Sequence, residues 1–134
     1  MTPSGLIVEL SSGSFFESGS AVIKESMVTT LIDLSELIQD FPTEDYRVDV
    51  EGHTDNVPIN TAQFPSNWEL SALRAVNVAH IFEDTGIPRD RIAAIAYADT
   101  RPKKPNTDEM GVNIAENQAE NRRVVVFVTD LKGM

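Results

Sequence analysis

The chain is organised around Val50-Glu51-Gly52-His53-Thr54-Asp55-Asn56 and Asn67-Trp68-Glu69-Leu70-Ser71-Ala72-Leu73-Arg74-Ala75. The first stretch ends an apolar strand at Gly52 and then presents the carboxylate of Asp55. The second stretch begins a helix that carries Arg74 among apolar neighbours. Because both groups are expected at one rim of a sheet, they suit a ligand that carries an ammonium and a carboxylate. The rest of the chain is expected to be the scaffold that holds them.

The residues that flank this pair predict one strand and one helix. Residues 46–51 alternate between apolar and polar, which indicates a strand with one buried face, so helices are expected on only one side of the sheet. Ser66 and Glu69 have the spacing of a capping box, which places the start of the helix. Gly86 is expected just after its last residue, and Pro88 prevents its continuation.

The remaining segments are predicted from the same kinds of pattern. An apolar stripe at helical spacing predicts a helix over residues 21–41 that packs on the sheet and ends at Pro42. The Ser/Gly-rich loop 11–20 contains Phe15 and Phe16, and at least one of them should pin the loop to the core. Further strands are predicted at residues 6–10, 91–98 and 124–128, the last one central because it is apolar on both faces, and residues 99–120 are predicted to be irregular with a turn of helix near 114–119.

These elements predict a single α/β domain of the α+β type, because 134 residues suit one core. The order is β-α-β-α-β-β, and the architecture is a two-layer sandwich with a mixed sheet and helices on one face. We divide the chain into a lead-in strand and loop (1–20), the domain itself (21–130) and a short tail (131–134).

The composition limits the kinds of partner. The net charge of −10 argues against nucleic acid and anionic membrane, and the short cluster of Arg101, Lys103 and Lys104 is expected to be a solvated loop. The absence of cysteine excludes disulfides and thiolate metal sites. No apolar run approaches the roughly 20 residues that span a bilayer, and the first residues do not have the pattern of a signal peptide. If the protein works outside the cytoplasm, we expect this chain to be part of a longer one.

Motifs of common catalytic sites are absent from the sequence. The two histidines, His53 and His80, form no His-Glu-x-x-His zinc motif, and there is no nucleophile elbow or phosphate-binding glycine loop. His53 could be a general base beside Asp55, but a hydrogen-bonding role that shapes the loop is favoured because no nucleophile lies near it in sequence. We predict that the chain is not an enzyme and binds no metal or cofactor.

Four motifs, in this order and over nearly the whole chain, resemble the OmpA-like peptidoglycan-binding domain: Glu51-Gly52-His53-Thr54-Asp55, Leu70-Ser71-x-x-Arg74-Ala75-x-x-Val78, Pro102 and Asn121-Arg122-Arg123-Val124. Two further features resemble the flagellar motor stator subunits MotB and PomB, namely the phrase Ser66-Asn67-Trp68-Glu69-Leu70-Ser71 and the long interval of 14 residues from Asn56 to Glu69. One departure is Ala96-Tyr97-Ala98, where many members have Gly-Tyr-Gly, so the backbone there should approach a ligand less closely.

The resemblance implies a site for the meso-diaminopimelate of the peptidoglycan stem peptide, in which Asp55 takes the ammonium and Arg74 the carboxylate. The alternatives without a ligand are an Asx turn at Asp55 and a structural ion pair between Asp55 and Arg74. Trp68 is expected either to stack on a sugar or to anchor the long loop. The resemblance also implies a site wall of Asn121 and Arg122, and the other residues predicted to bind ligand are His53, Thr54, Asn56 and Leu70.

The function implied by the resemblance is non-covalent anchoring of a flagellar motor stator to the cell wall. It implies a periplasmic domain that forms a homodimer. The parent protein would be held in the inner membrane by an N-terminal helix and would partner a membrane subunit of the MotA/PomA type. The alternatives are a wall-anchoring domain of an outer-membrane protein or lipoprotein, and a wall-cleaving hydrolase that uses His53 and Asp55.

Overall fold

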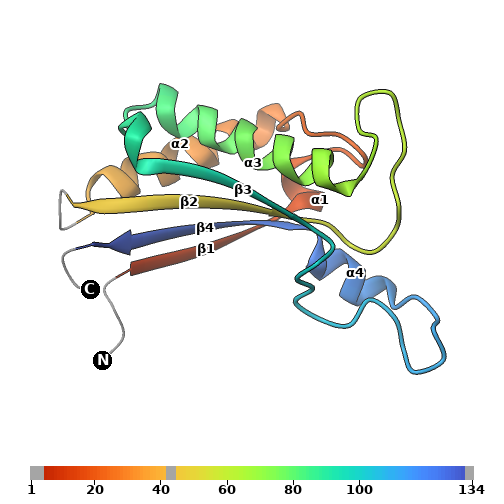
Figure 1. Ribbon diagram of the computed structural model, residues 1–134. Coiled ribbons are helices and arrows are strands. Elements are labelled where there is room, and N and C mark those ends of the chain that lie inside the picture. Colours follow the sequence, from red (N-terminus) through yellow and green to blue (C-terminus); the bar gives the residue numbers. More distant parts are fainter. Residues whose placement is uncertain (1–4, 42–44, 132–134) are drawn as a thin grey trace.

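Four strands form one mixed sheet, which the computed structural model describes together with the rest of residues 5–41 and 45–131 (Figure 1). In spatial order the strands are β1 (Gly5–Ser11), β4 (Arg123–Asp130), β2 (Tyr46–His53) and β3 (Ile92–Ala98). β4 runs antiparallel to both β1 and β2, whereas β2 and β3 are parallel. The mixed sheet and the central position of the last strand are therefore confirmed.

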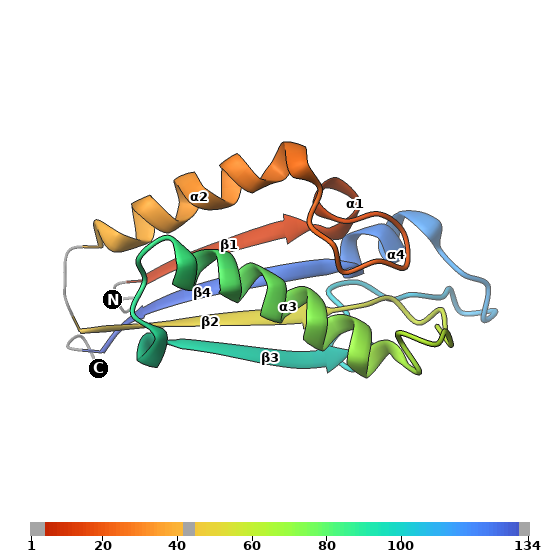
Figure 2. The ribbon, with the colours of Figure 1, turned by 90° about the horizontal axis from the view of Figure 1, so that it is seen from above.

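Two long helices, α2 (Glu25–Gln39) and α3 (Asn67–Asp84), cover one face of the sheet and leave the other face open (Figures 1 and 2). The two-layer architecture with helices on one face is therefore confirmed. No helix within the described ranges is long and apolar enough to cross a membrane. The core between the layers contains alternate residues of the two middle strands and one side of each helix, among them Val48, Val50, Val124, Val126, Leu31, Ile38, Val78 and Phe82.

The helix predicted over residues 21–41 begins only at Glu25. Before it, Asn77 Nδ2 donates a hydrogen bond to the Ala21 carbonyl at 2.7 Å, and Ile23 pairs with Phe16 in an isolated β-bridge. These contacts hold the segment in an extended conformation. These are tertiary contacts, and the spacing of apolar residues along the sequence cannot predict them.

Three short helical segments complete the chain: α1 (Ser12–Phe15), the 3₁₀ helix η1 (Arg89–Arg91) and α4 (Ala115–Asn121). α1 lies in the predicted loop, and both Phe15 and Phe16 are buried, as expected for a loop pinned to the core. η1 includes Arg91, so β3 starts one residue later than predicted. α4 extends the predicted turn of helix and lies beyond the end of the sheet (Figure 1).

The start of α3 is capped as predicted. Ser66 is the N-cap, and its Oγ accepts a hydrogen bond from the Trp68 backbone N–H at 3.2 Å. Glu69 is also a partner of Ser66, but its carboxylate accepts from the Ser66 hydroxyl rather than from the backbone. The cap therefore fixes where the helix begins, immediately after the long loop.

The end of α3 also follows the prediction. Gly86 has φ of 120°, which favours glycine, and its N–H donates to the Glu83 carbonyl while that of Ile87 donates to the Phe82 carbonyl. This pattern is a Schellman motif, which satisfies the last carbonyls of the helix. The other long helix ends at Gln39, two residues before the end predicted at residue 41, and Pro42 itself lies outside the described residues.

Gly52 allows α3 to lie directly against β2. A Cβ atom at this position would be 2.0 Å from the backbone oxygen of Ser71, far inside van der Waals contact. Only glycine leaves room for the helix backbone at that point. The contact sets where the helix crosses the strand, and it thereby places the side chains of the first turns of α3 over the end of β2.

We predict that Gly52→Ala destabilises the fold by about 3 kcal/mol or more, because the helix must move away from the sheet to admit the methyl group. Chemical denaturation monitored by circular dichroism measures this loss. Gly13→Ala is the matched control, because the nearest atom to a Cβ there is 3.9 Å away. Equal stability of the two variants would contradict the role assigned to Gly52.

Candidate functional site

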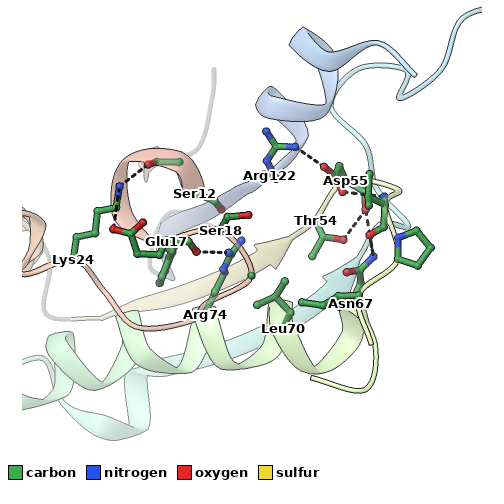
Figure 3. Close-up of a pocket in the computed structure, with 16 residues that line it drawn as sticks. Ser12, Glu17, Ser18, Lys24, Thr54, Asp55, Asn67, Leu70, Arg74 and Arg122 are labelled. Carbon is green, nitrogen blue, oxygen red and sulfur yellow. Dashed lines mark hydrogen bonds and ion pairs between the residues drawn. The ribbon is translucent and has the colours of Figure 1, made fainter. Parts of the chain in front are cut away.

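A cavity of about 580 Å³ opens at the end of β2, between the loop after this strand, the start of α3 and the segment that joins β1 to α2 (Figure 3). This size is typical of pockets that hold small ligands. Five of the predicted site residues line it, namely Thr54, Asp55, Leu70, Arg74 and Arg122.

Asp55 is buried, with 6% of its surface exposed, and each of its carboxylate oxygens has a partner. Oδ1 accepts a hydrogen bond from the Val57 backbone N–H at 2.9 Å, which is the Asx turn considered from the sequence. Oδ2 forms an ion pair with Arg122 Nη1. The structural ion pair of Asp55 is therefore made with Arg122, not with Arg74.

Arg74 projects from α3 into the other side of the cavity and is 4% exposed. Its Nε donates to the Ser20 carbonyl at 2.8 Å and its Nη2 to the Glu17 carbonyl at 3.4 Å, while the guanidinium lies over the Phe16 ring. Burial, and secondarily Arg122, lower the pKa of Arg74 to about 10, so the group is still cationic at neutral pH. Its Nη1 donates no hydrogen bond to the described part of the chain, which leaves a donor for a ligand.

The segment between β1 and α2 forms one wall of the cavity, and the sequence did not identify it as part of the site. It contributes Ser12, Gly13, Phe16, Glu17, Ser18, Gly19 and Lys24. The sequence indicated only that at least one of two phenylalanines pins this loop to the core. That burial was the one available signal that the loop lies close to the other site elements.

Asn56 and Asn121 do not line the cavity but support the residues that do. Asn56 Oδ1 accepts from Gln118 Nε2 at 2.7 Å, which links the loop after β2 to α4. Asn121 is fully buried. Its side chain accepts a hydrogen bond from the Lys104 backbone N–H and donates one to the Lys104 carbonyl. These contacts fix the segment before β4, from which Arg122 reaches Asp55.

His53 lies on the opposite side of the sheet. Strand alternation puts it on the same face as Glu51, away from α2 and α3. Its ring stacks on Tyr97 with a centroid distance of 5.1 Å, and Nε2 is 3.4 Å from Glu51 Oε1. Burial, and secondarily Arg123 and Arg101, lower the pKa of His53 to about 4, so it is neutral at pH 7. Within the described residues no hydrogen bond joins His53 to Asp55.

Trp68 is 50% exposed on the first turn of α3 and does not line the cavity.

The residues of the predicted basic cluster contact acids and a ring of the same chain. Lys103 Nζ is 2.8 Å from Glu9 Oε2, Lys104 Nζ is 2.9 Å from Glu120 Oε2, and Arg101 lies over the Tyr97 ring. No group of three or more candidate metal ligands occurs in the part of the chain that the structure describes.

The fold and the site define a class of small α+β domains that have helices on one face of a mixed sheet and a charged cavity at the end of the second strand. The chain belongs to the OmpA family, which matches residues 15–118.

Three relatives illustrate this membership. The chain is 33% identical over 129 residues to motility protein B of Bacillus subtilis, which covers 96% of this chain and 46% of the relative. It is similar to the crystal structure of the periplasmic domain of Helicobacter pylori MotB, with a TM-score of 0.80, 29% identity and coverage of 95% and 83% of the two chains. It is equally similar to the cell wall anchor of the T6SS from Pseudomonas aeruginosa, with a TM-score of 0.82, 32% identity and coverage of 94% and 82%.

The chain spans about half the length of the curated relatives it matches. It is homologous to MotB periplasmic domains, as the resemblance of its motifs indicated, and it is also homologous to a T6SS wall anchor. These matches are to binding domains, and they indicate no enzyme family.

The lowered pKa of His53 predicts that this residue makes the fold sensitive to acid. The unfolded chain binds a proton at this histidine near pH 6.5, whereas the folded protein binds it only near pH 4, so stability falls as the pH drops through that window. The loss should reach about 2 to 3 kcal/mol.

Urea denaturation of the wild type and of His53→Gln, compared between pH 7.5 and 4.5, tests this. The wild type should lose stability relative to the variant below pH 6.5, although the variant lacks the stacking on Tyr97 at every pH. A constant difference across the range would show that His53 does not titrate as described.

Proposed function

We propose that this domain binds peptidoglycan non-covalently, through the diaminopimelate of the stem peptide. Asp55 takes the ligand's ammonium, and Arg74 takes its carboxylate. The observation that carries this proposal is that a buried carboxylate and a buried guanidinium line one cavity without pairing with each other. Membership of the OmpA family and homology to a cell wall anchor support it.

Both groups can bind a ligand while they keep their contacts within the protein. A carboxylate offers about four acceptor positions, and Asp55 has two protein partners, so an ammonium can be added beside Arg122. Arg74 can donate from Nη1 to a carboxylate. Each charge-assisted bond contributes about 1.5 to 3 kcal/mol, so a single site binds weakly.

We further propose that the domain anchors a flagellar motor stator to the wall. In this proposal it lies in the periplasm, on a parent protein that an N-terminal helix holds in the inner membrane beside a MotA/PomA-type subunit. The homology to MotB periplasmic domains supports this assignment. The equal similarity to the T6SS wall anchor favours a second candidate, a wall anchor of another assembly, such as an outer-membrane protein or lipoprotein. A transmembrane helix with an acidic residue, encoded upstream in the parent gene, would support the stator assignment.

We predict that Asp55→Asn and Arg74→Lys each weaken binding to purified sacculi by about tenfold or more, because the first removes the charge that holds the ammonium and the second removes the guanidinium nitrogen that donates to the carboxylate. Asparagine retains the Asx turn, and lysine retains the positive charge without the planar fork. Co-sedimentation with sacculi measures the bound fraction.

Asp33→Asn on the exposed side of α2 and Arg89→Gln in η1 are the matched controls, and both should sediment like the wild type. Thermal melts of all four variants show whether the fold is intact. If both site variants are folded and sediment like the wild type, the assignment of this cavity to peptidoglycan is wrong.

We also propose that the domain acts as a homodimer, because two weak sites on one polymer bind much more tightly than one. The expected gain in apparent affinity is on the order of 100- to 10,000-fold when both sites can reach the polymer. Analytical ultracentrifugation should show a dimer. A dimer forced by a fused coiled coil should sediment with sacculi at far lower concentration than a monomer. Equal binding by the forced dimer and the monomer would contradict this.

A further inference from the structure

The cavity carries an excess of positive charge in a strongly acidic chain. Its ionisable residues are three cations, Lys24, Arg74 and Arg122, and two anions, Glu17 and Asp55. The whole chain has a net charge of −10. A ligand with one ammonium and one carboxylate adds no net charge, so it leaves one cation of the cavity uncompensated. The cavity is therefore complementary to a ligand that has a second carboxylate.

Lys24 is the cation with the weakest protein partners. Its Nζ donates to the Gly13 carbonyl at 3.1 Å, and the nearest carboxylate oxygen, Glu17 Oε1, is 3.9 Å away. The Glu17 side chain is 77% exposed and the Lys24 side chain 32%. An ammonium has three donors, and Lys24 uses one of them for a hydrogen bond. Arg122 and Arg74, by contrast, are already engaged with Asp55 and with backbone carbonyls.

Lys24 and Glu17 lie at one end of the cavity, Asp55 and Arg122 lie at the other, and Arg74 lies between them (Figure 3). A volume of about 580 Å³ leaves room for more than the single residue held by Asp55 and Arg74. A peptide that places its ammonium at Asp55 and one carboxylate at Arg74 therefore extends toward Lys24.

The backbone of Lys24 is held in the same segment that Arg74 contacts. The Lys24 backbone N–H donates to the Phe15 carbonyl at 2.8 Å, and Arg74 holds the Ser20 carbonyl of the same segment. The ammonium is thus presented by an ordered wall rather than by a free loop. Little backbone entropy is therefore lost when Lys24 binds a ligand.

We propose that Lys24 binds a second carboxylate of the same stem peptide, which makes the site specific for a peptide with an unamidated acid next to the diaminopimelate. This inference rests on the proposed function of the cavity. Two carboxylates have the required chemistry: the α-carboxylate of the γ-linked D-glutamate before the diaminopimelate, and the carboxylate at the end of the stem. Amidation of the relevant carboxylate removes the charge and therefore the contact.

Isothermal titration calorimetry with three synthetic peptides tests the proposal. The first is L-Ala-γ-D-Glu-meso-diaminopimelate-D-Ala, the second has the glutamate α-carboxylate converted to an amide, and the third has the C-terminal carboxylate converted to an amide. The wild type should bind the first peptide about three- to fivefold more tightly than one of the two amides, the range expected for a partly exposed ion pair. That amide identifies the carboxylate that Lys24 contacts.

Lys24→Met should weaken binding of the first peptide by the same factor and leave binding of the identified amide unchanged, because the contact is then already absent. Lys24→Arg should retain the discrimination, and Glu17→Gln should increase it, because Glu17 competes for the ammonium. A purely structural role of Lys24 would weaken all three peptides equally.

The proposal is overturned if Lys24→Met binds all three peptides as the wild type does, or if it loses the same factor on each. Binding of the first peptide by the wild type, weakened about tenfold or more by Asp55→Asn, tests the proposed function separately from the Lys24 contact. With that binding present, a null result for Lys24 affects only this second carboxylate contact. With that binding absent, the proposed function fails and this inference fails with it.

Discussion

The close approach of α3 to β2 at Gly52 is the constraint on which the site depends. Ser71 lies against the strand there, and its Oγ accepts a hydrogen bond from the Ala98 N–H at 3.1 Å. One helix is thereby tied to the ends of two parallel strands, which places Leu70 and Arg74 beside Asp55. Ala98 keeps a left-handed φ of 53°, a conformation that costs an L-residue roughly 1 to 2 kcal/mol, so this strand end keeps a glycine-like backbone without a glycine.

Arg74 has a structural role, through its hydrogen bonds within the protein, and a binding role, through its charge. A buried guanidinium is costly unless it is hydrogen-bonded, and the carbonyls of Ser20 and Glu17 satisfy two of its nitrogens. Because those partners are neutral, the positive charge of Arg74 remains available to a ligand. Asp55, by contrast, forms an ion pair with Arg122. The cavity therefore presents a cation to a ligand, and its buried carboxylate is still paired.

Charged residues on the open face of the sheet and those in the cavity are balanced differently. On the open side several basic residues contact acids or aromatic rings of the same chain, as with Lys103 and Glu9 or Arg101 and Tyr97. In the cavity the cations outnumber the anions. Net charge argues against a polyanionic partner such as nucleic acid, but an average over the chain does not report this local excess of cations, because the excess depends on which loops meet.

The sequence by itself determined the order of strands and helices, both ends of α3, the burial of at least one of Phe15 and Phe16, and the choice of Asp55 and Arg74 as site candidates. These features follow from periodicity, capping and turn chemistry, which act over a few residues. Only the tertiary structure decided that Arg122 is the partner of Asp55, 67 residues away, and that Arg74 holds the Ser20 carbonyl, 54 residues away. It also decided that His53 faces away from the cavity and that Lys24 enters it. The physical reason is that each of these contacts requires distant segments to meet at the end of β2, and no local pattern encodes such a meeting.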